Sequence, residues 1–488
     1  MSRNKKVIKE KRYYKIKFTL KSPLAIGDGS NYTTDRDIVR DSKGVPYIPA
    51  SAIAGVSRVA FLKDDNLIKE YFGKVDINTD VTNSENQDKK NKASKLVFYD
   101  AKMSDKADYH ISVRDSVALD DHKTALDGAK FDMEVLEPGV EFTTYIEQNV
   151  YKDLETEQDV CEESDIKQNV RKDSETEQNM CEESEKNIAK EIAYWWLQNK
   201  IYLGGKVMRG YGAIGNVLVY EKKFSIDGDV SKWLSFDMYN EDSWSDASKV
   251  VCDKICDDGM VSVKLKLKQN SGISIRKYTT KYSEDNGETM PDSEQLVIHL
   301  NGKEIPVIPG TSWAGAFSHR MKDLVSECKE NDFFGSGVKK NDEEKDENKE
   351  NKGKSGEQDN NENKKIRSKI RFGETQLEGA KSKIMTRNAI DRFSGGTANQ
   401  ALFTEKTYYG GKGDLKIEIK KECLSKNVAK ALAAAITDLH MGFLAVGGLT
   451  AIGRGLFKVE EINVNGKVVD WEENTMYSSI VNALGGVN

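Results

Sequence analysis

The chain has 488 residues, of which 38% are hydrophobic and 32% charged, and a formal net charge of −6. That length is too great for one ordinary core and predicts two or three domains. No apolar run approaches a membrane span, and the N-terminal residues lack the apolar stretch of a signal peptide, so we expect a cytoplasmic protein. The acidic excess lies mostly in residues 152–186, and the mildly basic remainder does not exclude RNA as a ligand.

The predicted elements run in the same order twice along the chain. Each half opens with an alternating, β-rich run, at 13–20 and at 260–268. A helix is expected next, starting at Ser51 in the first half and at Thr311 or Ser312 in the second, because these residues suit an N-cap. A longer helix follows, and a glycine-rich segment with a last strand closes each half; these lie at 186–200 and 204–219, and at 426–441 and 447–459.

Five landmarks recur in the same order, which indicates a true duplication. They are VPYIPASAIAGVSR and IPVIPGTSWAGAFS, EYFG and DFFG, KLVFYDA and KIRFGET, KNIAKEIA and KNVAKALA, and the closing segments GGKVMRGYGAIGNVLV and GGLTAIGRGLFKV. The order strand–helix–strand–strand–helix–strand in each half predicts an α+β protein built from two tandem ferredoxin-like, RRM-like domains.

These patterns divide the chain into two domains, three insertions and a tail. The insertions are polar stretches with too little apolar surface to offset the entropy of ordering, and one of them is an acidic repeat whose role stays open. We predict a first domain at 1–225 with insertions at 75–94 and 146–186, a linker at 226–259, a second domain at 260–465 with a disordered insertion at 338–366, and a C-terminal tail at 466–488.

Cysteine and histidine patterns argue against several classes of enzyme. The six cysteines form no CxxC pair, and Cys252 and Cys256 have no further metal ligand nearby, so we favour ordinary thiols over a zinc site. The five histidines form no HxxxH or HxE pattern, which gives little support to a zinc hydrolase or a histidine-based ribonuclease. A serine hydrolase would need a nucleophile elbow, and the sequence has none.

Three aspartates, Asp35, Asp37 and Asp41, lie within seven residues of a predicted loop. Their carboxylates could bind a divalent cation. They could also position a 2′-hydroxyl for attack on the adjacent phosphate. The alternative is a solvated loop with local pairs between arginine and aspartate.

Arginines in the glycine segments and in two polar stretches are candidates for phosphate contacts. Arg209 and Arg454 lie within the glycine segments, whose spacing also fits a tight turn between helix and strand. A dinucleotide fingerprint is excluded, because these glycines follow a helix and precede a strand. Arg114 and Arg387 open the two polar stretches, which we predict to be exposed hairpins, with flexible loops as the alternative.

Together these landmarks resemble the RAMP superfamily, and most of all the backbone subunits that polymerise along the guide RNA in type III CRISPR complexes. That family has an aspartate loop before an I/V-R-D run, a P-Y-I-P-G-S-S-L-x-G turn and helix, an F-G landmark, an R-x-A…T-G-x-A…F-E hairpin and a glycine-rich loop. The chain matches it at Ile38-Val39-Arg40-Asp41, Pro46–Gly55, Phe72-Gly73, Pro306–Gly315, Phe334-Gly335 and Ser394–Ala398. The match covers most of both halves outside the insertions.

The resemblance implies a subunit for antiviral defense that binds CRISPR guide RNA and cleaves target RNA within a complex. Its partners would be the large polymerase-like subunit, the small subunit and other RAMP subunits. In the family the palm binds the guide backbone, a hairpin thumb displaces a base, and a loop aspartate cleaves beside it with a divalent metal such as Mg²⁺. The family spacing, counted back from Arg40, places that catalytic and metal-binding aspartate at Asp35, with Asp37 as a second catalytic candidate.

The residues expected to bind RNA come from the loop, the helix starts, the hairpins and the glycine segments. They are Arg40, Ser51, Arg58, Arg114, Lys206, Arg209, Thr311, Ser312, Arg387 and Arg454.

The second copy departs from the family pattern. A lysine usual after the turn is Ala54 in the first copy and Ala314 in the second. The same count in the second copy, back from His299, lands on Glu294, with Asp292 two residues before it and no Arg-Asp pair. We therefore expect a weak or inactive second cleavage site, with Asp292 and Glu294 as its candidates, that still binds RNA.

Two other hypotheses stay open. In the first, both halves are a non-catalytic scaffold that binds guide RNA. In the second, the chain is a guide-precursor processing ribonuclease of the same superfamily, against which the lack of a well-placed histidine argues.

Overall fold

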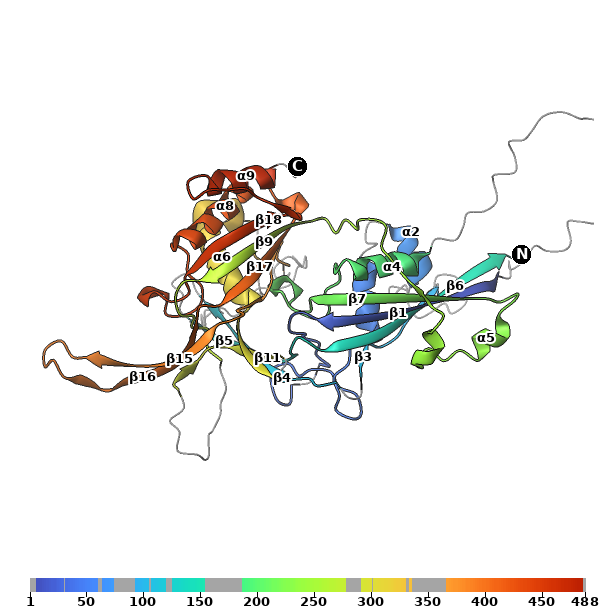
Figure 1. The fold of residues 1–488 in the computed structure, drawn as a ribbon, viewed down its shortest axis with the longest axis horizontal. Helices are drawn as coiled ribbons and strands as arrows, with labels where there is room; N and C mark the ends of the chain where they lie inside the picture. Colours follow the sequence, from blue (N-terminus) through green and yellow to red (C-terminus); the bar gives the residue numbers. More distant parts are fainter. Residues whose placement is uncertain are drawn as a thin grey trace, which may run out of the picture.

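The computed structural model describes residues 6–29, 31–59, 64–73, 93–104, 107–119, 125–153, 187–277, 291–300, 302–330, 333–335 and 366–485. Figure 1 shows two bodies side by side, each with a sheet and helices packed on it. The α+β prediction is confirmed by this mixture of helices and antiparallel sheets.

The first body is a sheet in the order β2-β6-β1-β7-β8, with β3 paired to β6. All neighbouring strands are antiparallel, and β4 and β5 form a separate hairpin. Its elements are β1 (Lys6–Leu20), α1 (Ala50–Val59), α2 (Asp65–Leu67), η1 (Ile68–Phe72), β2 (Leu96–Phe98), β3 (Lys102–Met103), β4 (Ile111–Leu119), β5 (Ala125–Leu136), β6 (Glu141–Asp153), α4 (Ile188–Leu197), η2 (Val207–Arg209) and β7 (Ile214–Ser225).

The second body repeats this arrangement, with a sheet in the order β13-β17-β9-β18-β19 and a long hairpin of β15 and β16. Small strands β10, β11, β12 and β14 lie beside it. Its elements are β9 (Met260–Gln269), β10 (Ser293–Glu294), β11 (Val297–Leu300), β12 (Lys303–Ile308), α6 (Gly310–Leu324), α7 (Glu327–Glu330), β13 (Ile370–Phe372), β14 (Thr375–Gln376), β15 (Lys381–Ile390), β16 (Thr397–Tyr409), β17 (Lys412–Lys420), η4 (Lys421–Cys423), α8 (Lys426–Met441), η5 (Thr450–Ile452), β18 (Phe457–Val464), β19 (Lys467–Val468) and α9 (Met476–Gly485).

Each body has its own hydrophobic core between its sheet and its helices. Strand β9 shows why its sequence forms a strand: alternate side chains, such as Val263 and Leu265, are buried, while the lysines between them face outward. Helix α8 buries one stripe of residues that includes Leu432 and Ile436. Ser425 caps this helix by accepting a hydrogen bond from the N–H of Val428.

The predicted helices and strands are found close to their expected positions. The predicted helix at 426–441 has those bounds, and the one at 186–200 spans Ile188–Leu197. The shorter helices begin one residue before the expected caps, at Ala50 and Gly310. Pro309 precedes the second of these helices and makes no side-chain capping bond, so the capping role predicted for Thr311 or Ser312 is wrong.

The segment predicted as a linker has structure of its own. It forms α5 (Val230–Leu234), η3 (Glu241–Trp244) and β8 (Ser248–Lys249). Its aromatic side chains pack on the sheet face that carries Tyr13 and Tyr145, and Trp244 is buried there. Likewise, the predicted tail contributes β19 and α9, and the latter packs against α8. The predicted insertions fall largely outside the described residues, except that β6 continues to Asp153.

No helix among the described residues is long and apolar enough to cross a membrane.

A buried ion cluster joins the two bodies. Arg114 on β4 is 2% exposed and its Nη2 lies 3.0 Å from Glu137 Oε2. The Nη1 of Arg114 lies 3.4 Å from Oε2 of Glu374, which belongs to the second body. Burial raises the pKa of Glu374 to about 7, although the charge of Arg114 acts in the opposite direction. Loss of the arginine would leave two carboxylates buried without a counter-charge.

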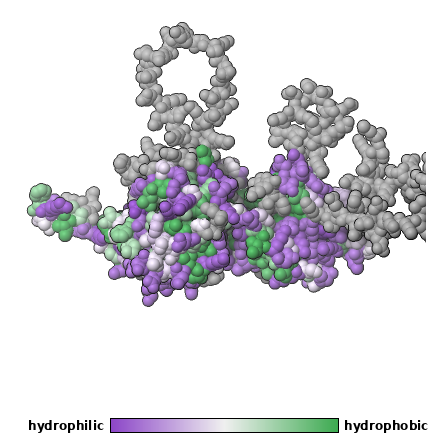
Figure 2. Space-filling model, turned by 90° about the horizontal axis from the view of Figure 1, so that it is seen from above, coloured by the Kyte–Doolittle hydropathy of each residue, from purple (hydrophilic) through white to green (hydrophobic). Residues whose placement is uncertain are grey.

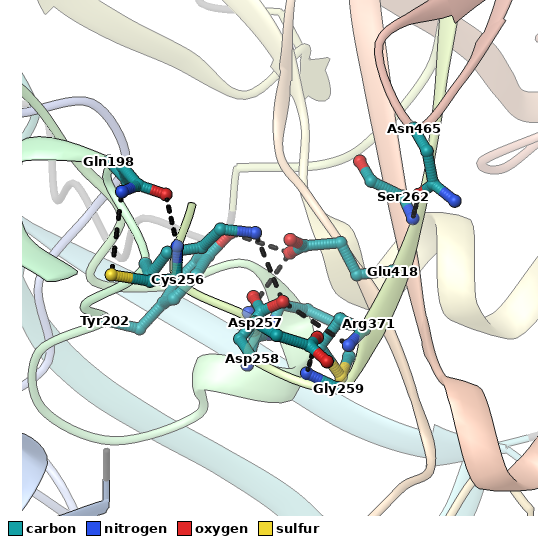
Figure 3. A network of polar contacts seen from close by, with 12 residues as sticks. Gln198, Tyr202, Cys256, Asp257, Asp258, Gly259, Ser262, Arg371, Glu418 and Asn465 are labelled. Carbon is teal, nitrogen blue, oxygen red and sulfur yellow. Dashed lines mark hydrogen bonds and ion pairs between the residues drawn. The ribbon is translucent and has the colours of Figure 1, made fainter. Parts of the chain in front are cut away.

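A second contact between the bodies centres on Tyr202, and Figure 3 shows it with Arg371 and Glu418 of the second sheet. The Tyr202 hydroxyl donates to Glu418 Oε2 at 2.7 Å, and the Arg371 guanidinium lies 3.8 Å from the ring centroid of Tyr202. Burial opposes ionisation of Glu418, but the charges of Lys416 and Arg371 outweigh it and lower its pKa to about 2. This contact therefore stays charged and intact at neutral pH.

The buried Glu374 gives the stability of the protein a definite pH dependence. Its pKa rises from 4.5 to about 7 on folding, so between these values the folded chain binds more protons than the unfolded chain. The contribution of this group to the free energy of unfolding therefore falls as pH rises through that window. We expect Glu374→Gln to flatten this fall, measured by thermal unfolding from pH 4.5 to pH 7. The exposed Glu378→Gln is the matched control, and equal slopes in both variants would contradict the prediction.

Candidate nucleic-acid interface

Asp35 lies in an exposed loop that is tied to the strand β5. Its N–H donates to Asp132 Oδ1 at 2.8 Å, and the N–H of Asp132 donates to Asp35 Oδ2 at 2.9 Å. The other oxygen of each carboxylate accepts no hydrogen bond from the described residues. The loop thus holds two carboxylates together at the base of the hairpin β4–β5.

Asp37 has a different position and is buried, at 4% exposure. Its carboxylate accepts from the backbone N–H groups of Tyr32, Thr33 and Thr34 and from the Thr34 hydroxyl. Desolvation would raise the pKa of Asp37, but these hydrogen bonds together outweigh it and lower that pKa. Asp37 therefore organises the loop, and its predicted catalytic role is not compatible with this placement.

Arg40 connects the same loop to strand β5 through an ion pair with Glu134. Its Nη2 lies 2.9 Å from Glu134 Oε2, and Glu134 also accepts from the N–H of Ile38 at 3.0 Å. The Arg40 side chain is 33% exposed, so the predicted phosphate contact stays a prediction.

The second copy contains a counterpart of the aspartate loop. Bridges pair Gly27 with Ile38 in the first copy and Arg276 with Gln295 in the second. Asp35 lies three residues before Ile38, and Asp292 lies three residues before Gln295. The structure thus aligns Asp292 with Asp35, whereas the count from His299 gave Glu294.

The hydrogen bonds support the same alignment. Asp292 Oδ2 accepts from the N–H of Thr404 on β16 at 2.7 Å, as Asp35 accepts from Asp132 on β5. Glu294 corresponds to Asp37 and lies within β10. The chemistry differs, because Thr404 takes the place of Asp132. Its hydroxyl lies 3.0 Å from the hydroxyl of Thr386, so the second copy has one carboxylate at this place.

The glycine segments have the same backbone pattern in both copies. Gly212 N–H donates to Pro23 and Gly455 N–H donates to Gly272, each at 2.8 Å. Lys206 and Leu449 have the same left-handed conformation, with φ of 51° and 57°. By this alignment Lys206 and Arg209 of the first copy correspond to Leu449 and Ile452 of the second. The second segment keeps a cation at another place, Arg454, which pairs with Glu405.

Besides Arg40, three more of the predicted RNA-binding arginines are paired with acidic residues. Arg114 is buried in the cluster between the bodies, and Arg454 is 8% exposed and pairs with Glu405. Direct contact of either with RNA is incompatible with these positions, because both are desolvated and neutralised. Arg387 pairs with the same Glu405 but remains 31% exposed. The register of the hairpins also shows that Arg114 and Arg387 are not counterparts, since they face Met133 and Phe403.

The remaining predicted contacts lie at the two short helices. Ser51 and Arg58 are exposed on α1, while Thr311 and Ser312 are partly buried at the start of α6. The N–H of Ala50 donates to Asp100 Oδ1 at 2.7 Å, so a carboxylate already caps α1. RNA binding by these four side chains stays a prediction.

Sequence reasoning missed Asp132, which carries half of the aspartate pair. It lies on the hairpin strand, and only the register of the folded chain brings it beside a loop 97 residues earlier. No group of three or more metal-ligating side chains occurs in the parts of the chain that the structure describes. Two carboxylates are nevertheless a donor set that suits a hard cation such as Mg²⁺, which commonly binds through one or two carboxylates and substrate phosphates.

The family model of the RAMP superfamily matches residues 17–215 and 286–458. The chain therefore belongs to the RAMP superfamily. It is a tandem RAMP protein, because the two matched regions coincide with the two bodies of the fold.

Among solved structures, the chain is similar to one chain of a type III-B Cmr-beta complex bound to cognate target RNA. The identity is 13% and the TM-score 0.29, over 42% of this chain and 61% of that one. The similarity thus spans about three-fifths of that chain. The curated proteins contain no match.

The different roles of Asp37 and Asp35 can be tested by amide hydrogen exchange. Replacing Asp37 by Ala removes a charged acceptor from the amides of Tyr32, Thr33 and Thr34, and such a bond contributes roughly 1.5–3 kcal/mol. We expect these amides to exchange about tenfold faster or more in Asp37→Ala. Asp35→Ala is the control and should accelerate the amide of Asp132 instead. Unchanged exchange in Asp37→Ala would contradict the structural role.

Proposed function

We propose that the chain is a guide-RNA-binding backbone subunit of a type III CRISPR interference complex, and that its first copy cleaves target RNA. It would act in the cytoplasm with a large polymerase-like subunit, a small subunit and other RAMP subunits. Membership of the RAMP superfamily and the ordered motifs in both copies support this proposal.

The sheet topology supports an RNA-binding fold of the ferredoxin-like type. In each body the strand order is second-third-first-fourth, with helices after the first and third strands, as in β2-β6-β1-β7. The RRM has this connectivity. The aromatic face of the first sheet is covered by the connector at 230–249, so we place the RNA along the loops and hairpins instead.

The observation that carries the cleavage proposal is the exposed carboxylate of Asp35, held at the base of a hairpin. A hairpin that displaces a target base would strain the phosphodiester next to that base. An aspartate fixed to the same hairpin by Asp132 would then lie beside the strained bond. Positioning of this kind accounts for much of the rate of a phosphodiester cleavage.

The chemistry needs a group that acts on a 2′-hydroxyl. The free oxygen of Asp35 can accept the proton of that hydroxyl as the 2′-oxygen attacks the adjacent phosphorus in line. The bond from phosphorus to the 5′-oxygen then breaks, which leaves a 2′,3′-cyclic phosphate and a 5′-hydroxyl whose oxygen takes a proton from solvent. The free oxygens of Asp35 and Asp132 would hold a divalent cation. When bound, that cation would neutralise the charge that develops on the phosphate.

The hairpin of the second copy has features of a wedge. Figure 2 shows it extending beyond the body, with hydrophobic residues among hydrophilic ones. Ile390, Phe393 and Leu402 on it are exposed, Phe393 completely. Exposed apolar side chains at the end of a strand pair are suited to insertion between bases, since unstacked bases stack on apolar surface.

The second copy supports binding better than cleavage. Asp292 has the position of Asp35, but Thr404 offers no second carboxylate for a cation. We propose that this site is weak. A guide-binding scaffold without cleavage in either copy is the alternative. It is favoured by the lack, among the described residues, of any group of three or more metal-ligating side chains.

The proposal is tested by cleavage of labelled target RNA on the guide-loaded complex with Mg²⁺. Asp35→Asn should lower the rate at one position of the target by about 10²–10⁴-fold, because the general base is lost, and should leave guide binding unchanged. Chelation of the metal should stop cleavage. Asp292→Asn should affect at most a second, slower cut.

Matched variants separate the two copies. Asp132→Asn should raise the Mg²⁺ concentration needed for the first cut, and Thr404→Asp should strengthen the second. Asp470→Asn, an exposed aspartate outside both loops, is the control. A wild-type complex that binds guide and target but does not cut under any metal would leave the scaffold as the function.

A further inference from the structure

A basic pocket lies between the two bodies. Residues 206–209 of the first glycine segment line one side, and Phe334-Gly335 and 366–368 of the second body line the other. Its volume is about 370 Å³. It carries the cations Lys206, Arg209 and Arg367 and has no acidic residue in its lining.

These three cations have no carboxylate partner among the described residues. Lys206 Nζ donates to the hydroxyl of Ser116 at 3.2 Å and lies 4.8 Å from the ring centroid of Phe131. Arg209 donates through Nη2 to the carbonyl of Phe334 at 2.9 Å, and its Nη1 is buried without any hydrogen-bond partner. Buried donors of this kind normally have a partner, so the pocket offers an unused donor beside two further cations.

Electrostatics in the pocket oppose the charged form of these groups. Burial and the neighbouring charges of Arg36 and Arg209 lower the pKa of Lys206 to about 8. Burial also lowers the pKa of Arg209, and burial and Arg371 lower that of Arg367. An anion bound among them would offset both the desolvation and the mutual repulsion.

The backbone requires the two bodies to approach closely here. A Cβ at Gly210 would lie 2.5 Å from the carbonyl oxygen of Phe372, and one at Gly310 would overlap the carbonyl of Arg209. Glycine at both positions lets the first glycine segment seat on the start of α6. The pocket is therefore a built feature of the joint between the copies.

The second glycine segment lacks the two cations that line the pocket. Its backbone is equivalent, but Leu449 and Ile452 stand where the first has Lys206 and Arg209, and Ile452 is 58% exposed. Arg454 of that segment pairs with Glu405. Of the two glycine segments, only the one that meets a second copy therefore carries cations without a carboxylate partner among the described residues.

We infer that this pocket is a phosphate site shared by the two copies, in which Lys206, Arg209 and Arg367 bind one phosphodiester of the guide RNA. The inference rests on the proposed guide binding and adds the place at which a single phosphate is held. Arg209 gives its free Nη1, and Arg367 gives a guanidinium from the opposite wall. The guide would therefore cross the joint, and its phosphate would tie the two copies together.

The test pairs a protein variant with a guide variant. Guide RNAs with one methylphosphonate each, which removes one charge, are bound to complexes that carry wild type or Arg367→Gln. One methylphosphonate should weaken binding to wild type about tenfold. The same methylphosphonate should weaken binding to Arg367→Gln by a clearly smaller factor, because only Lys206 and Arg209 still face the phosphate there. Arg367 is exposed and forms no hydrogen bond or ion pair within the described part of the chain, so its replacement should leave the fold intact. Arg209 also donates to Phe334 across the joint and is therefore left intact.

Lys430→Gln, an exposed cation on α8, is the matched control and should behave as wild type. Lys206→Gln should show the same coupling to the same phosphate. The inference is overturned if every methylphosphonate weakens wild type and Arg367→Gln by the same factor, while the proposed function would stand.

A further experiment distinguishes the anion site from guide-RNA binding if the purified complex holds no RNA. Binding of inorganic phosphate to the full-length chain is then measured by titration calorimetry. Binding that Arg367→Gln abolishes would keep the anion site but overturn the RNA phosphate as its ligand. No binding would overturn the site itself.

Discussion

The close approach of backbone at the first glycine segment is the constraint on which the rest of the structure depends. A side chain at Gly212 would overlap the carbonyl of Leu203, and the N–H of Gly205 donates to the carbonyl of Ala25. These contacts fix the segment beside the end of β1, next to the aspartate loop. The same segment then seats on the second copy, so one short stretch sets the loop, the joint and the basic pocket.

The duplication preserved this backbone and changed its chemistry. Asp35 and Asp292 have the same hydrogen bond to a hairpin strand, yet only the first has a second carboxylate beside it. The glycine segments differ in the same way. The first has Lys206 and Arg209 without a carboxylate partner among the described residues, and the second has Arg454, which pairs with Glu405. The two copies therefore share one backbone geometry, and we propose different tasks for them: cleavage of target RNA for the first and RNA binding for the second.

The sequence predicted the elements well where the pattern is local. The alternation in β9 and the buried stripe of α8 depend only on near neighbours in the sequence. The aspartate loop was also visible, as three acids in a polar segment. The sequence did not reveal that Asp35 and Asp37 have different roles. The burial of Asp37 depends on how residues 32–34 fold over its carboxylate.

Contacts between residues far apart in the chain could not be predicted from the sequence. Arg114 looked like an exposed cation, and its partner Glu374 is 260 residues away in the sequence. The linker offered a signal that was missed: Trp233, Phe236 and Trp244 are too apolar for a solvated connector, and they pack on the first sheet. Periodicity cannot supply such pairings, since they are set by the register of sheets and by the joint between the copies.

We propose that the first aspartate loop binds a metal ion beside the target RNA. This proposal can be tested by replacing Mg²⁺ with Fe²⁺ in the guide- and target-loaded complex and adding ascorbate, so that hydroxyl radicals cut the protein backbone around the bound ion. The account predicts cuts close to Asp35 and Asp132, lost in Asp35→Asn, and few near Asp292 and Thr404. Cuts confined to other parts of the chain, or an unchanged pattern in Asp35→Asn, would contradict it.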